Sequence, residues 1–495
     1  MKSLLRIVII LAITVMLLVA GSCKSRPAPE KPAADPARIG AAENALKPAL
    51  YEKGKPPAAM NILDRMKHYR VPGVSVAVIN EGKIEWAKGY GVKETGGQDP
   101  VTSETLFQAA SISKPVTALG VLRLVEKGIL DLDAPVNDKL VSWKVPENEF
   151  TKKEKVTLRR LLTHSAGLTV SGFPGYAATD PIPTIIQVLN GEKPANTPPI
   201  RVDMVPGSQW RYSGGGFLVT QLLVADVTGR PFPDYMKTTV LNPLGMDHST
   251  FAQPLPPDKV DQAASGHEMN GEAVKGKWHV YPELPAAGLW TTPSDLCRLA
   301  IELQKSASGE SHKVISPEMA GKMLTPGTGN WGLGIGLGAP TTEERRSFSH
   351  GGGNKGFICM LFAFVHKGQG AVIMTNSDNG NSLVTEILRG LSSVYGWAIL
   401  QPKEVSLVKI PSEKLAPYAG DYRSADESEA PVLVSIEKDQ LHLKSPDIGE
   451  WALSPVSETE FVYMDGGISV TFVKGSDGRY DQVKYWDIVH SRKKG

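Results

Sequence analysis

The first pattern that could do chemistry is Ser111-Ile112-Ser113-Lys114, which places a hydroxyl and an amine three positions apart. If Ser111 begins a helix, Lys114 follows one turn later on the same face. A buried lysine with a lowered pKa could take the serine proton and make the hydroxyl a nucleophile. The helix N-terminus would add N–H groups where an oxyanion forms. Taken alone, the pattern favours a helix cap, because the same spacing recurs without comparable context at Ser406/Lys409, Ser435/Lys438 and Ser491/Lys494.

Two later stretches change that interpretation. Tyr212 precedes Ser213 and a run of three glycines at the start of a predicted helix. A tyrosine beside a cationic amine can ionise more easily than its reference pKa of about 10 and can then shuttle a proton. The alternative is an aromatic ring packed against a sheet.

The second stretch, 349–354, reads Ser-His-Gly-Gly-Gly-Asn before a predicted strand. Its glycines would let a substrate backbone lie along a strand edge, and the alternative is an ordinary turn.

Together and in this order, these patterns resemble the penicillin-binding protein and serine β-lactamase superfamily. The branch they resemble is the class C β-lactamase-like one, which also contains DD-peptidases, D-aminopeptidases and carboxylesterases. The segments 161–168, 287–292 and 331–334 match as well. The resemblance implies an α+β fold for roughly residues 60–400, with an antiparallel sheet flanked by helices and a helical subdomain.

The resemblance also implies a role for each matching residue. Ser111 would be the acylated nucleophile, and Lys114 and Tyr212 would transfer its proton, with either of them as the base in acylation. The backbone N–H groups of Ser111 and Gly353 would form the oxyanion hole. The substrate-binding residues would be His350, Gly351 and Gly352. No cofactor is expected. We expect no metal site either, because His248 and His267 have no ligand-like companions.

Two departures from the family bear on the substrate. Gly214 stands where the second motif commonly has Asn, whose amide would bind the lysine and the substrate carbonyl. His350 replaces the lysine of true β-lactamases, and a mostly neutral imidazole is a weaker clamp for a carboxylate. We therefore expect an esterase or a peptidase for D-amino-acid amides rather than an efficient β-lactamase. The alternative is a non-catalytic binder of penicillin or cell-wall peptide, acting as a sensor or scaffold.

The elements that position these residues follow from periodicity. Two β-rich runs, 74–79 and 83–90, predict a hairpin, and 107–130 predicts a helix. Further helices are expected at 158–163, 217–227, 294–303 and 384–395, and further strands at 332–338, 356–365 and 370–375. Strands at both ends with helices between them predict an antiparallel sheet closed by the two termini. Within this domain, 58–400, we expect His164 to order the loop after its helix.

After Gln401 the pattern changes to short alternating runs separated by turns, which predicts a small all-β barrel over 401–495. The segment Tyr418-Ala419-Gly420-Asp421-Tyr422 is similar to lipocalin-like domains appended to some of these hydrolases.

The first residues predict export. An apolar run over 7–20 follows two basic residues, and Val19-Ala20-Gly21-Ser22-Cys23 resembles a bacterial lipobox, in which the cysteine is lipidated. Residues 1–23 would then be a signal peptide and Cys23 the membrane anchor of an outer-membrane lipoprotein. Ordinary cleavage near Ser22, giving a periplasmic or secreted protein, and a short membrane anchor are the alternatives. The Pro- and Ala-rich stretch 24–57 is expected to be a tether.

The composition limits the class of protein and the kinds of partner that the chain can have. The chain has 495 residues, 41% of them hydrophobic and 21% charged, which is typical of globular proteins. Its formal charge of +2 gives no basic field for nucleic acid, so the expected partners are a small ester, amide or peptide substrate and, through Cys23, a membrane. Three cysteines exclude a disulfide scaffold, and Cys297 and Cys359 are expected to be buried free thiols.

Overall fold

The computed structural model describes residues 35–338, 342–425, 430–446, 448–476, 478–486 and 488–493. Cys23 and the predicted signal peptide lie outside these residues. Residues Ala37–Gly495 form one compact unit. In the part of the chain that is described, no helix is both long and apolar enough to span a bilayer.

The predicted antiparallel sheet is present. Its strands run in the order β3-β2-β9-β8-β7-β6. Their bounds are β2 (Gly73–Asn80), β3 (Lys83–Gly91), β6 (Gly336–Leu337), β7 (Ser347–Asn354), β8 (Phe357–Phe364) and β9 (Gly370–Thr375). Strand β2 pairs with β9, with Val76 opposite Ile373, so strands from the two ends of the domain close the sheet as expected. His350 and the glycines after it lie within strand β7 rather than in a turn.

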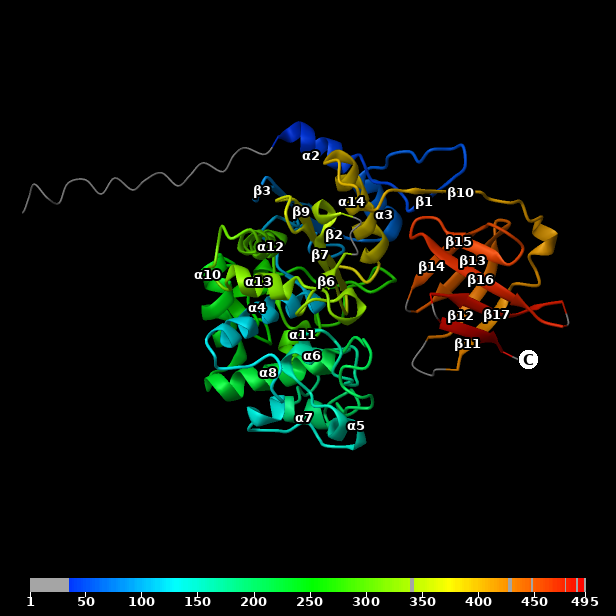
Figure 1. The fold of residues 1–495 in the computed structure, drawn as a ribbon. Helices are drawn as coiled ribbons and strands as arrows, with labels where there is room; N and C mark the ends of the chain where they lie inside the picture. The colour runs from blue at the N-terminus through cyan, green and yellow to red at the C-terminus, as the bar shows by residue number, and fades with distance from the viewer. Residues whose placement is uncertain are drawn as a thin grey trace, which may run out of the picture. The chain divides into compact units, whose positions relative to one another are not determined.

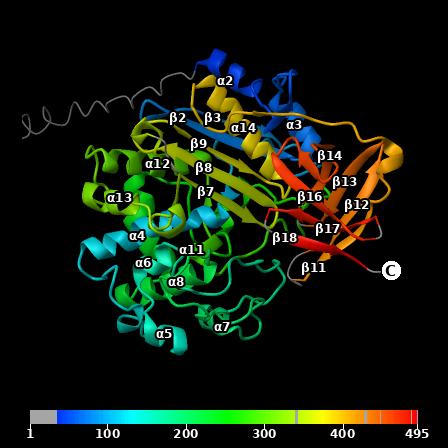
Figure 2. The ribbon, with the colours of Figure 1, turned by 45° about the vertical axis from the view of Figure 1, so that its right-hand side comes forward.

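Helices cover the sheet on both sides. Helices α3 (Ile62–Tyr69) and α14 (Gly380–Val394) lie along one face, and the helical region lies on the other (Figure 2). That region contains α5 (Glu149–Lys153), α6 (Leu158–Leu162), α7 (Ile185–Asn190), α8 (Gly214–Thr228), α9 (Phe232–Met236), α10 (Asn242–Leu244), α11 (Leu284–Ala287), α12 (Pro293–Ala307) and α13 (Pro317–Met323). This is the predicted α+β architecture.

The helix predicted over 107–130 is shorter than expected. Its first residues form strand β4 (Phe107–Gln108), which pairs with β5 (Trp290–Thr291), and then a 3-10 turn, Ala110–Ile112. Helix α4 proper is Ser113–Glu126, and the chain turns away at Gly128, whose φ of 69° suits glycine.

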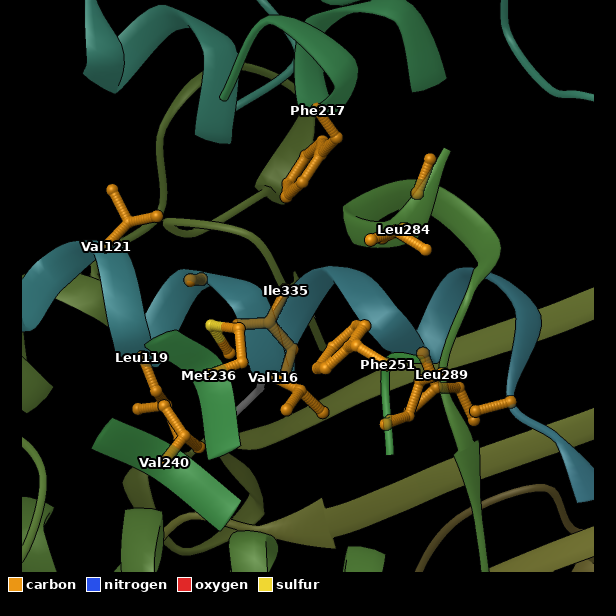
Figure 3. Close-up of a cluster of buried hydrophobic side chains, with 14 of the residues drawn as sticks. Val116, Leu119, Val121, Phe217, Met236, Val240, Phe251, Leu284, Leu289 and Ile335 are labelled. Carbon is orange, nitrogen blue, oxygen red and sulfur yellow. The ribbon is translucent and has the colours of Figure 1, made fainter. Parts of the chain in front are cut away.

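Apolar side chains surround helix α4. Val116 and Leu119 pack there among Phe217, Met236 and Ile335 (Figure 3). Buried residues occupy almost its whole length, so α4 is a central helix of the core rather than an amphipathic surface helix. The turn that carries Ser111 therefore sits on a support that packing holds from every side.

The C-terminal barrel is also present. Strands β11–β18 close into an antiparallel barrel, seen in orange and red in Figure 1. The strands are β11 (Gly420–Ser424), β12 (Val432–Glu437), β13 (Gln440–Ser445), β14 (Gly449–Pro455), β15 (Glu460–Tyr463), β16 (Ile468–Lys474), β17 (Tyr480–Tyr485) and β18 (Ile488–Arg492). The barrel has its own hydrophobic core, which includes Tyr422, Leu443, Leu453 and Phe472.

Part of the predicted tether is regular structure. Helix α2 (Pro36–Glu43) and strand β1 (Leu50–Glu52) lie within it, and β1 pairs in parallel with β10 (Lys403–Val405). Leu46 is fully buried and exchanges backbone hydrogen bonds with Met60. The few apolar residues of this stretch are enough to fix it, because they pack against a core built elsewhere in the chain.

Candidate active site

Ser111 lies on the 3-10 turn that joins strand β4 to helix α4. The residue before it, Ala110, has a φ of 47°, in the left-handed region that residues with a Cβ rarely adopt. Ala110 and Ile112 are fully buried, whereas Ser111 is partly exposed. The strained turn thus presents one hydroxyl to solvent on an otherwise buried support.

Lys114 meets Ser111 as the spacing predicts. Its Nζ lies 3.0 Å from Ser111 Oγ and 2.9 Å from the carbonyl oxygen of Ala286 in helix α11. The side chain is 2% exposed, and burial lowers the pKa of the amine to about 7. At neutral pH a substantial fraction of Lys114 is therefore an uncharged amine, able to accept a proton.

Tyr212 joins this pair from a distant part of the chain. Lys114 Nζ lies 4.9 Å from the centre of its ring and 5.6 Å from that of Phe217. Burial raises the pKa of Tyr212 to about 12, against the opposing effect of a hydrogen bond with the Ser111 side chain. The expectation that Tyr212 ionises more easily than usual is therefore wrong, because burial outweighs that bond and Lys114 itself readily loses its charge.

His350 lies close to these groups but carries no charge. It is 5% exposed, and its Nδ1 lies 2.6 Å from the carbonyl oxygen of Gly351. Burial, with a smaller contribution from Lys114, lowers its pKa to about 3. His350 is therefore a neutral imidazole at physiological pH, an even weaker anion clamp than its sequence suggests.

The three glycines of strand β7 differ in how much space a side chain would have. A Cβ on Gly352 would lie 2.3 Å from the carbonyl oxygen of Ala109, so strand β7 touches the chain just before Ser111. Gly351 and Gly353 are exposed. Strand β6 pairs with β7 only at Phe348 and Ser349, which leaves the glycine segment beyond the reach of β6. Gly353 therefore directly follows the glycine that contacts the chain just before Ser111.

At Gly214, where the second motif of the family commonly has Asn, the structure leaves little room for a side chain. A Cβ on Gly214 would lie 2.9 Å from the ring of Phe173 and 3.0 Å from the carbonyl oxygen of Ser171. The backbone N–H of Gly214 donates to that same oxygen. The chain at 171–173 therefore occupies the space into which an Asn side chain would project.

Several site residues carry no clear signal in the sequence. Ala286 acts through its main-chain carbonyl, which any residue has. Asn354 Nδ2 donates to Gln108 Oε1 and to the carbonyl oxygen of Ala287, at 2.8 and 3.0 Å, and so links strand β7 to β4 and α11. The sequence offers one hint that Gln108 and Asn354 belong to the site: Gln108 lies near the Ser111 motif, and Asn354 follows the glycines.

Aromatic rings line the same region. The Trp331 ring centre lies 5.3 Å from that of His350 and 5.9 Å from that of Tyr212. Trp210, 37% exposed, lies 5.7 Å from Trp331. The His164 ring lies against that of Tyr212, with ring centres 4.2 Å apart and the planes tilted by 35°. The surroundings of Lys114 are thus largely apolar and aromatic, which is why its charged form is disfavoured.

A cluster of potential metal ligands lies in the barrel. Glu437, His442 and Glu450 place ligand atoms within 4.8 Å of one another, the one such group among the residues described. Lys444 Nζ, however, lies 2.5 Å from Glu437 Oε1 and 3.4 Å from Glu450 Oε2. The ammonium group pairs with both carboxylates, and His442 Nδ1 lies 2.6 Å from Glu450 Oε1, so these side chains form an ion-pair network on the barrel surface.

The chain is similar to several known proteins. Residues 59–392 match the protein-family model described as Beta-lactamase. Penicillin-binding protein 4* of Bacillus subtilis (strain 168) is 25% identical over 445 residues, covering 83% of this chain and 92% of its own. The octameric penicillin-binding protein homologue from Pyrococcus abyssi superimposes with a TM-score of 0.59 at 22% identity, over 87% of this chain and 98% of its own.

A second solved structure shares the fold of the main domain. The D-amino acid amidase from Ochrobactrum anthropi SV3, solved with L-phenylalanine, has a TM-score of 0.54 at 21% identity and covers 68% of this chain and 95% of its own. The family match spans both the turn that carries Ser111 and Lys114 and the strand that carries His350. The chain therefore belongs to the beta-lactamase family of penicillin-binding-protein-like hydrolases.

Proposed function

We propose that this chain is an exported serine hydrolase that cleaves an ester or amide through an acyl-enzyme on Ser111. The observation that carries the proposal is the 3.0 Å approach of Lys114 Nζ to Ser111 Oγ, combined with a pKa of about 7 for that amine. A serine hydroxyl at hydrogen-bond distance from an uncharged amine is an activated nucleophile.

Acylation follows from this pair. The neutral amine of Lys114 takes the Ser111 proton while Oγ attacks the substrate carbonyl, and the negative charge collects on the carbonyl oxygen. Backbone N–H groups of Ser111 and Gly353 stabilise that oxyanion. The bond to the leaving group then breaks, and the proton passes from Lys114 by way of Tyr212 to the departing oxygen or nitrogen. Tyr212 can relay it because its pKa of about 12 keeps its hydroxyl protonated.

Deacylation runs the same steps with water. A water molecule loses a proton to the Lys114–Tyr212 pair and attacks the ester carbonyl of the acyl-enzyme. The bond between the carbonyl carbon and Oγ breaks, Ser111 recovers its proton, and the acid leaves. Lys114 starts and ends each half-reaction as a neutral amine, so the site is ready for the next substrate.

The surroundings favour an uncharged substrate near strand β7. His350 is neutral there, and Gly214 offers no amide to hold a substrate carbonyl. The neutral imidazole weakens the grip on a β-lactam carboxylate, and the missing amide removes a donor to the carbonyl of its side chain. An ester or the amide of a D-amino acid fits better, and the fold shared with a D-amino acid amidase supports the second of these.

One observation favours a second candidate, a non-catalytic binder of penicillin or cell-wall peptide. The chain at 171–173 fills the place of the family's Asn side chain, which removes one group that orients the substrate. In this version Ser111 is acylated and the adduct persists. The protein would then act as a sensor or scaffold.

Intact-protein mass spectrometry after incubation with a fluorophosphonate tests the nucleophile. We expect one adduct on the wild type and on Ser393→Ala, an exposed serine of α14, and none on Ser111→Ala. Turnover is then measured with p-nitrophenyl esters, D-alanyl anilides and a chromogenic cephalosporin. Turnover of esters or anilides supports the hydrolase, a stable adduct without turnover supports the binder, and an unlabelled wild type refutes both.

We also propose that the mature protein is an outer-membrane lipoprotein, tethered by a lipid on Cys23 at the periplasmic face of the envelope. The lipobox-like sequence supports this. Cys23→Ser should move the protein from the membrane fraction to the soluble one. Unchanged partitioning would refute the anchor.

A further inference from the structure

His164 occupies a strained and buried position next to Tyr212. It follows helix α6, has a φ of 55° and is 2% exposed. A histidine held in the left-handed region costs conformational energy, which the surrounding structure must offset. Ordering a loop, the role its sequence suggests, does not require a buried imidazole at such a position.

The residues on both sides of Tyr212 bind to His164. The N–H of Arg211 donates to the His164 carbonyl oxygen at 2.8 Å. The N–H of Ser213 donates to the His164 ring at Nδ1, at 3.0 Å. One residue thus holds the main chain immediately before and immediately after the tyrosine.

The imidazole ring also covers the tyrosine ring. The two ring centres are 4.2 Å apart and the planes are inclined by 35°. Residues 211–213 belong to no helix or strand, so no ladder of backbone hydrogen bonds fixes the direction of the Tyr212 side chain. The contacts with His164 supply that constraint instead.

The ring must stay neutral to make these contacts. Because Nδ1 accepts a hydrogen bond, the proton of the neutral imidazole is on Nε2. Burial, reinforced by the nearby Lys114 and His350, lowers the pKa of His164 well below its usual range. The acceptor at Nδ1 is therefore available throughout the physiological pH range.

We propose that His164 is a positioning residue of the hydrolase: it holds the Tyr212 hydroxyl at Ser111 and Lys114 by binding both flanking peptides and packing against the ring. This inference rests on the proposed function, because it concerns the group that relays the proton. A displacement of a catalytic group by about 1 Å can cost about 10²-fold in rate.

Two variants separate positioning from simple structural support. His164→Gly removes the ring and the acceptor but adopts a left-handed backbone without strain. His164→Asn restores an acceptor near the place of Nδ1 and also tolerates this backbone. Both keep the main-chain carbonyl that binds Arg211. His267→Ala is the matched control, because His267 is another fully buried histidine, bonded through Nδ1 to the carbonyl oxygen of Asn376.

The experiment measures kcat, KM, Tm and the rate of fluorophosphonate labelling of full-length protein. We expect His164→Gly to lower kcat and the labelling rate by about 10- to 100-fold with KM within about twofold. His164→Asn should recover most of that loss, and His267→Ala should lower Tm without this loss of kcat.

A folded His164→Gly variant with wild-type kcat would overturn the inference while leaving the labelled wild type as support for the hydrolase. A His164→Asn variant as slow as the Gly variant would overturn it too. If His164→Gly does not fold, the comparison of His164→Asn with wild type decides, and a change confined to KM refutes positioning. An unlabelled wild type would instead refute the proposed function, and the inference with it.

Discussion

Gly352 lies so close to Ala109 that a Cβ on the glycine would stand 2.3 Å from the carbonyl oxygen of the alanine. The same Cβ would lie 2.6 Å from Cys359 Sγ, on strand β8. Strand β7 and the turn that carries Ser111 therefore meet main chain to main chain. This contact sets the distance between the nucleophile and the proposed oxyanion donor at Gly353.

Replacing Gly352 by Ala should force these two elements apart. We expect Gly352→Ala to lower the free energy of unfolding by about 1–3 kcal/mol, as overpacked cores do. We also expect it to reduce kcat by about 10²-fold, because one oxyanion donor is displaced. Urea unfolding and steady-state kinetics measure the two effects. Gly351→Ala is the control for stability, since its Cβ would meet nothing nearer than 3.7 Å. Equal stability of the two variants would contradict this account.

The pH dependence should follow Lys114. Its pKa is lowered from 10.5 to about 7 by burial, and below that pH the amine holds a proton and cannot take one from Ser111. We expect kcat/KM to rise with pH, about tenfold per unit below pH 7, and to level off above it. Tyr212, with a pKa of about 12, gives no falling limb in the neutral range.

Lys114→Arg provides the control for that profile. A guanidinium stays charged at every accessible pH, so we expect this variant to lose more than about 10²-fold in kcat without recovering at high pH. A wild-type profile that is flat between about pH 5 and 9 would show that another group is the base.

The part of the site that the sequence predicts by a local rule is the Ser111–Lys114 pair, which lies within one helical turn. Ser111 and Lys114 are close because residues three apart share a helix face, and the structure agrees at 3.0 Å. Their contact with Tyr212 depends instead on tertiary packing between distant segments. It could be expected only through the family resemblance, because no local rule of sequence connects those segments.

Main-chain contacts were beyond prediction for a different reason. The carbonyl oxygen of Ala286 that binds Lys114 is chemically the same in every residue, so no residue type marks it. The pKa of Tyr212 was predicted with the wrong sign because the sequence shows a neighbouring amine but not the burial that dominates. In the fold, the alternating patterns predicted the barrel and the hairpin correctly. Strand β1 was missed because its partner, β10, lies at the far end of the chain.

Restoring the family's Asn should not restore β-lactamase chemistry. In Gly214→Asn the new side chain meets Phe173 and the Ser171 carbonyl, and the main-chain oxygen cannot rotate away. We expect a loss of about 1–3 kcal/mol in stability and no gain in cephalosporin hydrolysis. Gly321→Ala, where a Cβ meets nothing within 4 Å, is the control for a glycine replaced without a clash. A stable variant with raised cephalosporin turnover would contradict the prediction and show that the loop yields readily.

Arg65 of helix α3 binds one carboxylate on helix α14 and one in the barrel. Its Nε and Nη2 lie 2.8 and 2.7 Å from the two oxygens of Glu386 on α14, and Nη2 lies 2.8 Å from Asp465 Oδ2 in the barrel domain. The Glu386 side chain is fully buried, whereas that of Asp465 is 23% exposed. Tyr69 OH donates to Glu386 at 2.7 Å. Because the two carboxylates differ in burial, removing each of them should lower the free energy of unfolding by a different amount.

We expect Glu386→Ala to cost about 3–5 kcal/mol, because it leaves the Arg65 guanidinium without its bidentate partner in a buried site. Asp465→Ala should cost about 1 kcal/mol or less, since water replaces much of what this more exposed carboxylate supplies. Urea unfolding followed separately by hydrolase activity and by far-UV circular dichroism measures both. Because Glu386 lies on α14, along the sheet that carries His350, its loss should shift the activity transition. An Asp465→Ala variant that is destabilised as strongly as Glu386→Ala would mean that the barrel contact, rather than the α3–α14 pair, stabilises this network.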